Sequence, residues 1–340
     1  MSDLDEGKLA DWLATVLPYG GSPLLIDKFA GGQSNPTYKV TQGRRVMVLR
    51  RKPFGTLLPS AHAIEREYRL IAALHSTGFP VPRAIALCED ASVIGAPFYL
   101  MTMVEGRNLW EGALPDTPRN ERRAHYEAMI DTLAALHTLN PQALGLGDFG
   151  RPGNYFARQI ERWTSQYRSA QTEDIAEAEH LIEWLPATLP AQDRTSIIHG
   201  DYRIDNLIFA SGAPEVAAVL DWELATIGDP LADFAYLAMN WIMPADGRSG
   251  LAGIDLAAAG LPTLDGAIAR YCAATGREGL PDLHWYFAYN LFRLTAIVQG
   301  IKKRLIEGNA SNAQAEVTVA RLVPLAQAAW VQARLAGAIA

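Results

Sequence analysis

The sequence feature that most constrains this chain is a polar loop held between two short apolar runs. The runs cover residues 196–198 and 207–209, and the loop between them carries one histidine, two aspartates and one asparagine. A third apolar run, residues 216–220, leads directly into Asp221. Short apolar runs bounded by turn residues are typical of buried strands. The stretch therefore predicts three strands that hold several polar side chains on one rigid surface.

The polar residues of this stretch match the needs of phosphoryl transfer. That reaction requires a carboxylate that positions the attacking hydroxyl and accepts its proton, and it requires Mg²⁺ to bridge the phosphates of the nucleotide. Mg²⁺ prefers carboxylate and amide oxygens. Asp201 suits the first role, and Asn206 and Asp221 suit the second. The alternative is a polar turn in which these residues serve only the backbone, but their combined spacing favours the functional interpretation.

Composition excludes several classes of protein. The chain carries 30 Lys and Arg against 37 Asp and Glu, so its net charge of -7 gives no sign of a surface for nucleic acid. Two cysteines, far apart in the sequence, argue against a disulfide scaffold and for a reducing compartment. The acidic N-terminus does not resemble a signal peptide, and no apolar run is long enough to cross a membrane. We therefore expect a cytoplasmic protein without membrane or nucleic-acid partners, and we leave its oligomeric state open.

The N-terminal third has the pattern of a small β-rich lobe with one long helix. Apolar runs separated by glycine and proline predict strands, and helical spacing of apolar residues predicts two helices. We assign residues 1–104 to an N-terminal nucleotide-binding lobe that ends in a hinge. The expected strands cover residues 24–30, 37–40, 46–50, 84–87 and 97–104, and the expected helices cover residues 3–17 and 60–76.

The remainder of the chain has the pattern of a larger and mainly helical lobe. We assign residues 105–340 to this C-terminal catalytic and substrate lobe, so the expected fold class is α+β. Residues 242–263 contain four glycines and two prolines, which predicts an irregular segment that could serve as a substrate loop. The expected helices cover residues 120–139, 154–170, 173–188, 231–241, 264–275, 282–307 and 312–337.

Several motifs resemble a known enzyme family. His199-Gly200-Asp201-x-x-x-x-Asn206 and Asp221-Trp222-Glu223 resemble the catalytic and metal loops of the aminoglycoside phosphotransferase family. A closer resemblance, over about residues 24–305, is to the phosphotransferase domain fused to some acyl-CoA dehydrogenases. It rests on Gly32-Gln33-Ser34-Asn35-Pro36, Leu49-Arg50-Arg51-Lys52-Pro53 and Tyr202-Arg203-Ile204-Asp205-Asn206.

This resemblance implies a fold, a chemistry and several roles. The fold is protein-kinase-like, with two lobes: a small β-rich N-lobe and a larger, mainly helical C-lobe. The activity is a small-molecule kinase that uses ATP and Mg²⁺ and phosphorylates a hydroxyl group. Asp201 is then the catalytic base, and Asn206 and Asp221 are the metal ligands.

A glycine-rich turn at residues 31–35 is the expected phosphate-binding element. Its glycines let backbone N–H groups approach a phosphate, and its serine adds a hydroxyl donor. The turn matches neither the Walker sequence nor the Gly-x-Gly-x-x-Gly of protein kinases, and a hairpin turn without a ligand is the alternative. The cofactor-binding residues expected here are Gly32, Gln33, Ser34 and Asn35.

A basic strand replaces the phosphate-binding lysine of protein kinases, which pairs with a helix glutamate. Alternation along the third strand places Arg50 on the nucleotide side, where its guanidinium can bind phosphate in a bidentate manner. Arg51 and Lys52 are the substitutes for this role. Glu67 is the favoured helix partner and Glu65 the alternative, while plain surface charge is the simpler interpretation of each.

Four further residues complete the expected site. The segment before residue 105 resembles the interlobe hinge of protein kinases, where backbone groups of Thr102 and Met103 would bind adenine. Arg203 stands where protein kinases keep a lysine that touches the transferred phosphate. Glu223 is either an additional metal contact or part of a loop salt bridge.

Three polar residues near the loop are expected to be structural. His199 braces the loop by hydrogen bonding. Asp229 and Pro230 read as the start of a helix, with Asp229 as the N-cap and Pro230 as the first helical residue. Asp233, in the first turn of that helix, is also expected to stabilise the fold.

The identity of the phosphate acceptor is the property that is hardest to predict from this sequence. Residues 242–308 hold six acidic and seven basic side chains, which makes a poor wall for a polycationic antibiotic. Trp285, Tyr286, Tyr289 and Phe292 either line an acceptor pocket or belong to the core, and their helical spacing favours the core. We expect a hydroxylated metabolite, and the dehydrogenase-linked relatives suggest a hydroxyacyl thioester. The alternatives are an aminoglycoside O-phosphotransferase and a nucleotide-binding regulator without catalysis.

Overall fold

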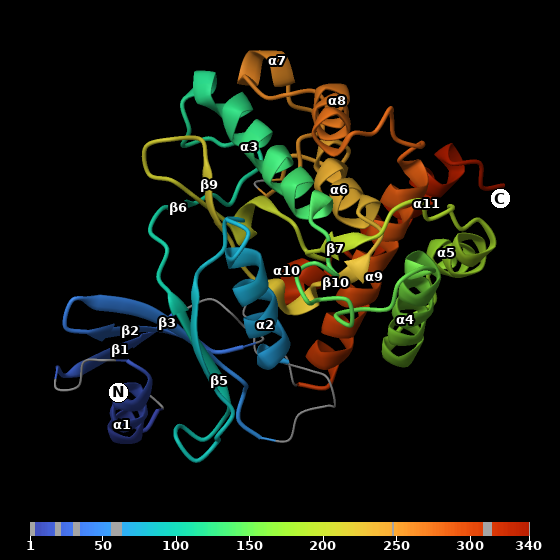
Figure 1. The fold of residues 1–340 in the computed structure, drawn as a ribbon. Coiled ribbons are helices and arrows are strands. Elements are labelled where there is room, and N and C mark those ends of the chain that lie inside the picture. Colours follow the sequence, from blue (N-terminus) through green and yellow to red (C-terminus); the bar gives the residue numbers. More distant parts are fainter. Residues whose placement is uncertain are drawn as a thin grey trace. The chain divides into compact units, whose positions relative to one another are not determined.

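The computed structural model describes residues 4–17, 22–29, 35–55, 63–246, 248–308 and 315–339. The chain divides into two compact units, whose elements are labelled in Figure 1. The division predicted at residue 104 stays a prediction, and the unit with the N-terminal sheet also takes in two later segments. The first unit comprises Met1–Trp110, Pro141–Phe149 and Ile204–Ala225; the second comprises Glu111–Asn140, Gly150–Arg203 and Thr226–Ala340.

An antiparallel five-stranded sheet forms the centre of the first unit, with the strand order β1-β2-β3-β5-β4. Helix α1 (Glu6–Val16) buries Leu9 and Leu13. They belong to one hydrophobic core with Tyr38 and Leu49, which are residues of the sheet. All five predicted strands are confirmed. They are β1 (Leu24–Lys28), β2 (Thr37–Gln42), β3 (Arg45–Arg51), β4 (Ala84–Cys88) and β5 (Phe98–Thr102).

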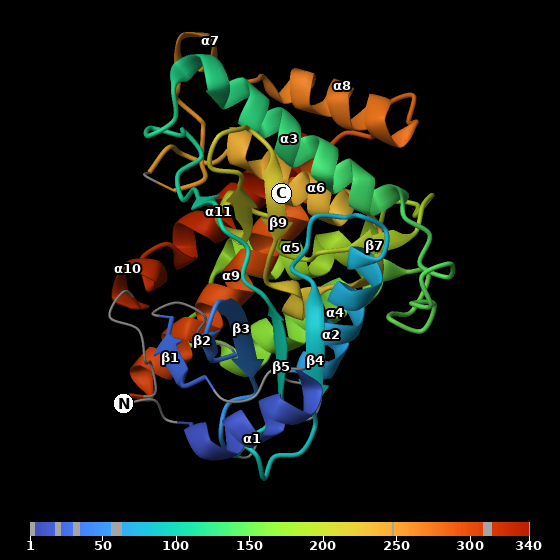
Figure 2. The ribbon, with the colours of Figure 1, turned by 60° about the vertical axis from the view of Figure 1, so that its left-hand side comes forward.

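Helix α2 (Ile64–His75) packs on β4 and β5, and Figure 2 shows it running beside β4. Apolar residues recur on one face of α2 at helical spacing, so that Ile64, Leu70, Ile71 and Leu74 are buried. Glu67 lies on the same buried face. The predicted helix began at residue 60, and its first residues lie outside the described part of the chain.

A second, three-stranded sheet of the first unit carries the stretch with which the sequence analysis began. Its order is β6-β8-β9, formed by β6 (Arg107–Asn108), β8 (Leu207–Phe209) and β9 (Val216–Val219). Two short 3₁₀ helices, η1 (Ile204–Asn206) and η2 (Trp222–Leu224), flank these strands. The predicted strands at 207–209 and 216–220 are confirmed, with β9 ending one residue early.

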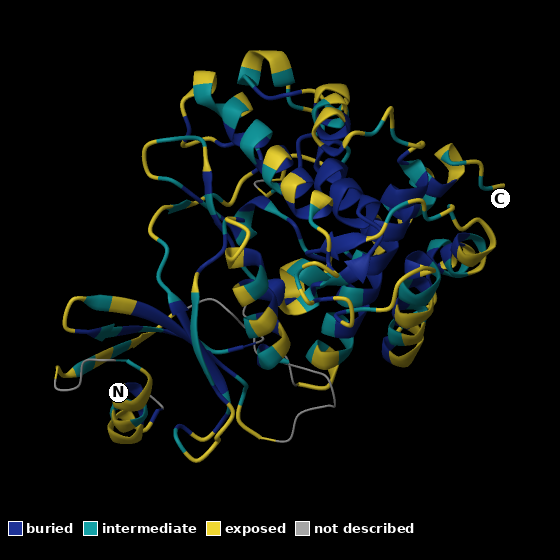
Figure 3. Cartoon of the chain, viewed as in Figure 1, coloured by how far each residue is buried: buried dark blue, intermediate teal, exposed yellow. Residues whose placement is uncertain are grey.

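The second unit is mainly helical and is built around α9 (His284–Ile306). Figure 3 shows α9 in dark blue along much of its length, because most of its residues from Trp285 to Gly300 are buried. Strand β7 (Ser196–Ile198), which was predicted, pairs with β10 (Thr226–Gly228). The other helices are α3 (Arg119–Thr138), α4 (Tyr155–Ala170), α5 (Ala176–Ala187), α6 (Leu231–Ala238), η3 (Met239–Trp241), α7 (Leu256–Ala259), α8 (Leu264–Thr275), α10 (Ala315–Val319) and α11 (Leu322–Leu335).

Two sequence predictions about the second unit need correction. The helix predicted over residues 312–337 is two helices, because α10 ends at Val319 and α11 begins at Leu322. Pro324 has no N–H to donate and therefore fits the first turn of a new helix better than a helix interior. The segment 242–263 is not wholly irregular: it contains α7, whose N-cap Asp255 accepts a hydrogen bond from the N–H of Ala258.

None of the described helices combines the length and the apolar character that a transmembrane helix requires.

Candidate active site

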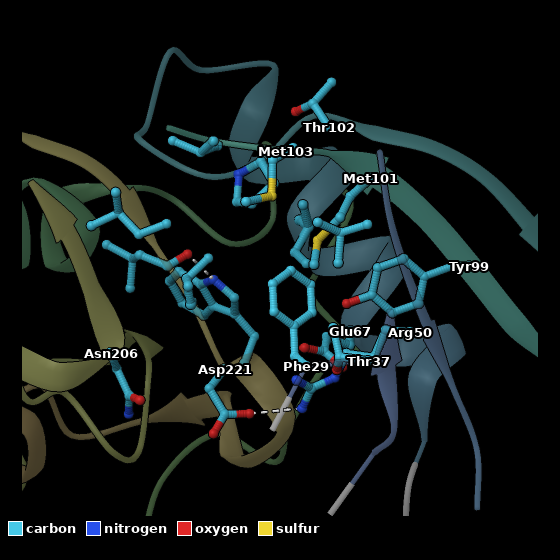
Figure 4. Close-up of a pocket in the computed structure, with 18 of the residues that line it drawn as sticks. Phe29, Thr37, Arg50, Glu67, Tyr99, Met101, Thr102, Met103, Asn206 and Asp221 are labelled. Atoms are coloured by element: carbon cyan, nitrogen blue, oxygen red, sulfur yellow. Dashed lines mark hydrogen bonds and ion pairs between the residues drawn. The ribbon is translucent and has the colours of Figure 1, made fainter. Parts of the chain in front are cut away.

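The first unit contains a cavity of about 300 Å³, shown in Figure 4. Most of its wall is apolar, and charged residues gather at one end. Figure 4 places Arg50, Glu67 and Asp221 at that end and the side chains of Met101 and Met103 at the other. Such a cavity suits a flat heterocycle that carries a charged group. It is lined by Phe29, Thr37, Val48, Arg50, Glu67, Ile71, Pro82, Tyr99, Met101, Thr102, Met103, Val104, Asp205, Asn206, Ile208, Val219, Leu220, Asp221 and Trp222.

Arg50 organises the charged end of this cavity. Alternation along β3 places it on the same side as Val48, and only 8% of its surface is exposed. Its Nε lies 3.1 Å from Oε2 of Glu67, and its Nη2 lies 2.7 Å from Oδ1 of Asp221. Glu223 is more distant, with 3.7 Å between its Oε2 and the same Nη2. One guanidinium therefore links β3, α2 and the end of β9.

The structure separates Arg50 from its sequence neighbours. Arg51 donates a hydrogen bond to the hydroxyl of Tyr38 and stacks on Phe54, with 3.6 Å between its Cζ and the ring centroid. Lys52 pairs with Glu65 over 2.7 Å. Among the residues that line the cavity, Arg50 is thus the cation, as strand alternation favoured, and Glu67, the preferred candidate, is its helix partner.

The charges around Arg50 shift each other's ionisation. Burial raises the pKa of Glu67 to about 6, although the guanidinium of Arg50 pulls it in the opposite direction. Burial opposes the charge of Arg50, but Glu67 and then Asp221 and Glu223 raise its pKa above the ordinary value. Three carboxylates thus face one guanidinium, which leaves negative charge for a further cation.

Asp221 has an unusual backbone conformation. Its φ of 65° and ψ of 63° place a non-glycine residue in the left-handed region. That conformation costs about 1 kcal/mol or more and persists only where the surroundings enforce it. The N–H of Leu220 donates to the carbonyl of Asn206 over 2.9 Å, which ties the Asp221 turn to η1. Such strain is concentrated at functional sites, which supports a functional role for Asp221.

Asn206 is positioned by Asn108 of β6, a residue that was not predicted to belong to the site. Nδ2 of Asn108 donates to the carbonyl of Asp205 over 2.7 Å and to that of Leu207 over 3.0 Å. These bonds hold the backbone on both sides of Asn206. Nothing in the local sequence signals this role, because Asn108 lies about a hundred residues earlier in the chain.

The expected hinge follows β5. The N–H of Thr102 already donates to the carbonyl of Arg83, and its hydroxyl accepts from the N–H of Arg83. Met103 lies just beyond the strand and lines the cavity together with Thr102. The N–H of Thr102 is therefore not available to a ligand, and the hinge role of Met103 stays a prediction.

The glycine-rich turn is described only at its end. The predictions for Gly32, Gln33 and Ser34 lie outside the described residues. Asn35 is 1% exposed, and its carbonyl accepts a hydrogen bond from the hydroxyl of Thr37 over 3.0 Å. Thr37, which the sequence analysis did not single out, lines the cavity.

In the second unit, Asp233 braces the loop that carries Asp201. Its Oδ2 accepts from the N–H of His199 over 2.6 Å, and its Oδ1 accepts from the N–H of Gly200 over 2.8 Å. The N–H of Asp201 then donates to Nδ1 of His199 over 3.1 Å. Gly200 has a φ of 84°, which favours glycine at this position. The structural roles expected for His199 and Asp233 are confirmed.

Asp233 is fully buried and ionised. Burial by itself would raise its pKa, but hydrogen bonding to His137 and the nearby His199 N–H hold the pKa below its ordinary value. Just before α6, Pro230 directly precedes the helix, and Asp229 accepts from the N–H of Leu231 over 2.9 Å. Asp229 therefore caps the first turn, but the helix begins at Leu231, one residue later than predicted.

Asp201 lies beside two residues of its own unit. Nε of Arg203 is 3.6 Å from Oδ1 of Asp201, and the Asp201 side chain is 24% exposed. Burial, followed by the charge of Asp201 and a hydrogen bond to it, raises the pKa of Tyr236. Tyr236 thus stays protonated and can donate to the carboxylate. Tyr236 was not predicted from the sequence, because it belongs to no motif.

The aromatic residues of α9 belong mainly to the core. Trp285, Tyr286 and Tyr289 surround the ring of Phe156 at centroid distances of 5.1, 5.4 and 5.0 Å. Phe292 is completely buried. These contacts favour the core interpretation over a pocket lined by all four residues.

Comparison with known proteins places the chain in a family. The model of the phosphotransferase enzyme family matches residues 26–280. The chain belongs to this family. A solved structure from Ralstonia eutropha JMP134, described as a candidate aminoglycoside phosphotransferase, is 45% identical with a TM-score of 0.89 and covers 98% of this chain and 99% of its own. The protein is thus a phosphotransferase of the type that acts on hydroxyl groups of small molecules.

Curated relatives of this phosphotransferase are considerably longer. Acyl-CoA dehydrogenase family member 10 of Mus musculus is 44% identical over 310 residues, which are 91% of this chain and 29% of the relative. Acyl-CoA dehydrogenase family member 11 of Homo sapiens is 40% identical over 306 residues, which are 89% of this chain and 39% of the relative. The predicted resemblance to the aminoglycoside phosphotransferase family and to the phosphotransferase domain fused to some acyl-CoA dehydrogenases is confirmed.

More distant structures agree on the fold. An aminoglycoside phosphotransferase solved in a ternary complex with ADP and hygromycin B is 13% identical with a TM-score of 0.62, and it covers 98% of this chain and 99% of its own. Together with the Ralstonia structure, it confirms the predicted protein-kinase-like α+β fold with a small sheet-containing part and a larger helical part.

Proposed function

We propose that this phosphotransferase is an ATP-dependent kinase of a hydroxylated metabolite, with a hydroxyacyl thioester as the acceptor. The observation that carries the proposal is Arg50, buried between Glu67 and Asp221 at the charged end of an otherwise apolar cavity. A guanidinium fixed by carboxylates is preorganised to bind phosphate oxygens in a bidentate manner. The apolar remainder of the cavity suits a purine base.

The base would be recognised at the hinge. Val48, Met101, Ile208 and Val219 line the apolar part of the cavity. We assign recognition of the adenine edge to the backbone of Met103, which lines the cavity just beyond β5, as a hinge does in protein kinases. Thr102 also lines the cavity, but its N–H donates to the carbonyl of Arg83 and is not available to the base.

Asn206 and Asp221 are the residues that we assign to Mg²⁺, with Glu223 as a further candidate. They fit the ion, because Asn206 and Asp221 line the same cavity and supply amide and carboxylate oxygens. The excess of carboxylates around Arg50 also favours a divalent cation there. When bound, Mg²⁺ would neutralise charge on the β- and γ-phosphates.

In the proposed reaction, Asp201 acts as the base. The acceptor hydroxyl forms a bond to the γ-phosphorus while its proton passes to the carboxylate of Asp201, and the bond from phosphorus to the ADP oxygen breaks. We assign contact with the transferred phosphoryl group to Arg203, whose Nε is 3.6 Å from Oδ1 of Asp201. Tyr236 orients the carboxylate by hydrogen bonding.

The acceptor can be tested directly. We expect the purified chain to consume Mg-ATP in the presence of a hydroxyacyl-CoA and to yield ADP and a phosphorylated thioester. Kanamycin should support little turnover, because the acidic and basic residues of segment 242–308 nearly balance. The measurement is ADP release together with the mass of the product. Turnover on kanamycin alone would refute the thioester.

The affinity for ATP should depend on pH through Glu67. Glu67 has a pKa of about 6, so it loses its charge as the pH falls through that value and no longer fixes Arg50. We expect the KM for ATP to rise below pH 6 by up to about tenfold per pH unit. Glu67→Gln should raise the KM for ATP at pH 8 and remove most of its dependence on pH. Glu65→Gln, which affects only Lys52, is the matched control.

The free energy of unfolding should respond to the same protonation in the opposite sense: as ATP binding weakens at low pH, the contribution of Glu67 to stability should increase. Because the folded pKa of Glu67 lies above its ordinary value of 4.5, folding favours the protonated form. The contribution of Glu67 to the free energy of unfolding therefore increases as the pH falls from above 6 toward 4.5.

A KM for ATP that does not depend on pH in the wild-type protein would contradict the assigned role of Glu67.

A further inference from the structure

A second buried arginine lies in the helical unit, and no carboxylate of the described residues forms an ion pair with it. Arg293 on α9 is 7% exposed, and its Nε is buried without a hydrogen-bond partner. Among the residues that the structure describes, none forms an ion pair or a hydrogen bond with this guanidinium. Arg50, by contrast, is equally buried but is paired with Glu67 and Asp221. Burying a charge without a partner is unfavourable, so Arg293 is poised for an anion or a strong acceptor.

Two aromatic rings fix the position of Arg293. Its Cζ lies 5.1 Å from the ring centroid of Tyr236 and 5.5 Å from that of Trp163. These rings come from α6 and α4, which both pack against α9. A guanidinium held against aromatic rings keeps N–H donors available in its own plane. Arg293 is therefore rigid and retains hydrogen-bonding capacity.

Tyr236 connects this arginine to the base. Its ring lies against Arg293, and its hydroxyl hydrogen-bonds to Asp201. The charge of Asp201 also acts on Arg293. The other polar groups that act on Arg293 are the hydroxyls of Tyr155 and Tyr289. If the acceptor hydroxyl lies at Asp201, a group a few bonds away in the same acceptor would thus lie near the guanidinium of Arg293.

We propose that Arg293 binds an acyl oxygen of the acceptor and thereby determines its specificity. The oxygen is either the carboxylate of a free hydroxy acid or the carbonyl of its thioester, which share this chemistry. The inference rests on the proposed function and adds to it the recognition of a group that does not react. An alcohol without an acyl oxygen would leave the guanidinium unpaired, and sites built around a buried polar group discriminate strongly against such analogues.

The test compares three acceptors of equal chain length: a short hydroxy acid, its CoA thioester and the corresponding diol. Arg293→Met keeps an unbranched apolar side chain and removes the guanidinium with its charge. We expect it to lower kcat/KM at least about tenfold for the acceptors with an acyl oxygen, mainly through KM, and to leave the diol unchanged. The ratio between the acid and the thioester identifies the source of the oxygen. Arg304→Met, on the same helix but exposed, is the matched control.

Two further measurements separate the possible outcomes. An equal loss on all three acceptors, in kcat, would mean that Arg293 acts on the transferred phosphate or on the fold, and the inference would be wrong. If wild-type protein phosphorylates none of the three, the proposed function fails. Calorimetric titration with the hydroxy acid then decides the inference alone: binding that Arg293→Met abolishes supports it, and absence of binding to the wild type overturns it.

Discussion

Asp201→Asn should reduce turnover by at least ~10²-fold and leave Mg-ATP binding intact. Asparagine has nearly the shape of aspartate, but it cannot accept the proton of the acceptor hydroxyl. The backbone of the loop is held by bonds that the substitution does not touch, from His199 and Gly200 to Asp233. The loss should therefore appear in kcat for the acceptor, measured by ADP release, while the affinity for the nucleotide, measured by calorimetry, stays the same.

Arg203→Lys provides the matched comparison for this prediction. It keeps a cation near Asp201 but removes the bidentate geometry, so its loss of turnover should be smaller than that of Asp201→Asn. Turnover of Asp201→Asn at the wild-type rate would show that the base has been misassigned. A parallel loss of nucleotide affinity would instead indicate a damaged fold.

Asp233→Ala should lower the free energy of unfolding by about 3 kcal/mol, since a buried acceptor of charge-assisted bonds is lost and its donors are left unpaired. The donors are the N–H groups of His199 and Gly200, and His137 lies 3.4 Å away. Urea denaturation at pH 7 measures the difference. Turnover should fall as well, because the loop that carries Asp201 loses its support.

The pH dependence of this effect has a defined sign. The folded pKa of Asp233 lies below its ordinary value of 3.8, so its contribution to stability is present above that value. The contribution disappears as the pH falls from 3.8 through the folded pKa, and the difference between Asp233→Ala and the wild type should shrink there. Asp229→Asn is the control, because asparagine is also a good cap for the N–H of Leu231. Equal stability of Asp233→Ala and wild-type protein at pH 7 would contradict the bracing role.

Much of the fold could be predicted from local patterns. The five strands of the N-terminal sheet were each marked by a short apolar run, and α9 by a long helical period. Prediction was less successful where a local signal was overlooked or was weak. Pro324 divides the predicted C-terminal helix, and Asp255 begins the short α7 within a segment rich in glycine and proline.

The residues of the candidate site likewise fall into those that local patterns predicted and those that they did not. The spacing of Asp201, Asn206 and Asp221 could be read directly, because one loop and the strand after it carry them. Glu67 was the favoured partner of Arg50 and Glu65 the alternative, and the structure pairs Arg50 with Glu67 and Lys52 with Glu65. Asn108, Tyr236 and Arg293 were not recognised, since each acts through residues that are distant in the sequence and matches no motif.

The sequence by itself determined the chemistry of this protein. The identities and spacing of the acid and amide groups are local, and they predict phosphoryl transfer without any tertiary information. Only the tertiary structure decided which charges meet, since Arg50 and Asp221 are 171 residues apart and come together because β3 and the end of β9 border the same cavity. Only the tertiary structure revealed that Arg293 is buried without a carboxylate partner among the described residues, because burial and pairing depend on how helices pack and not on the residues adjacent in the chain.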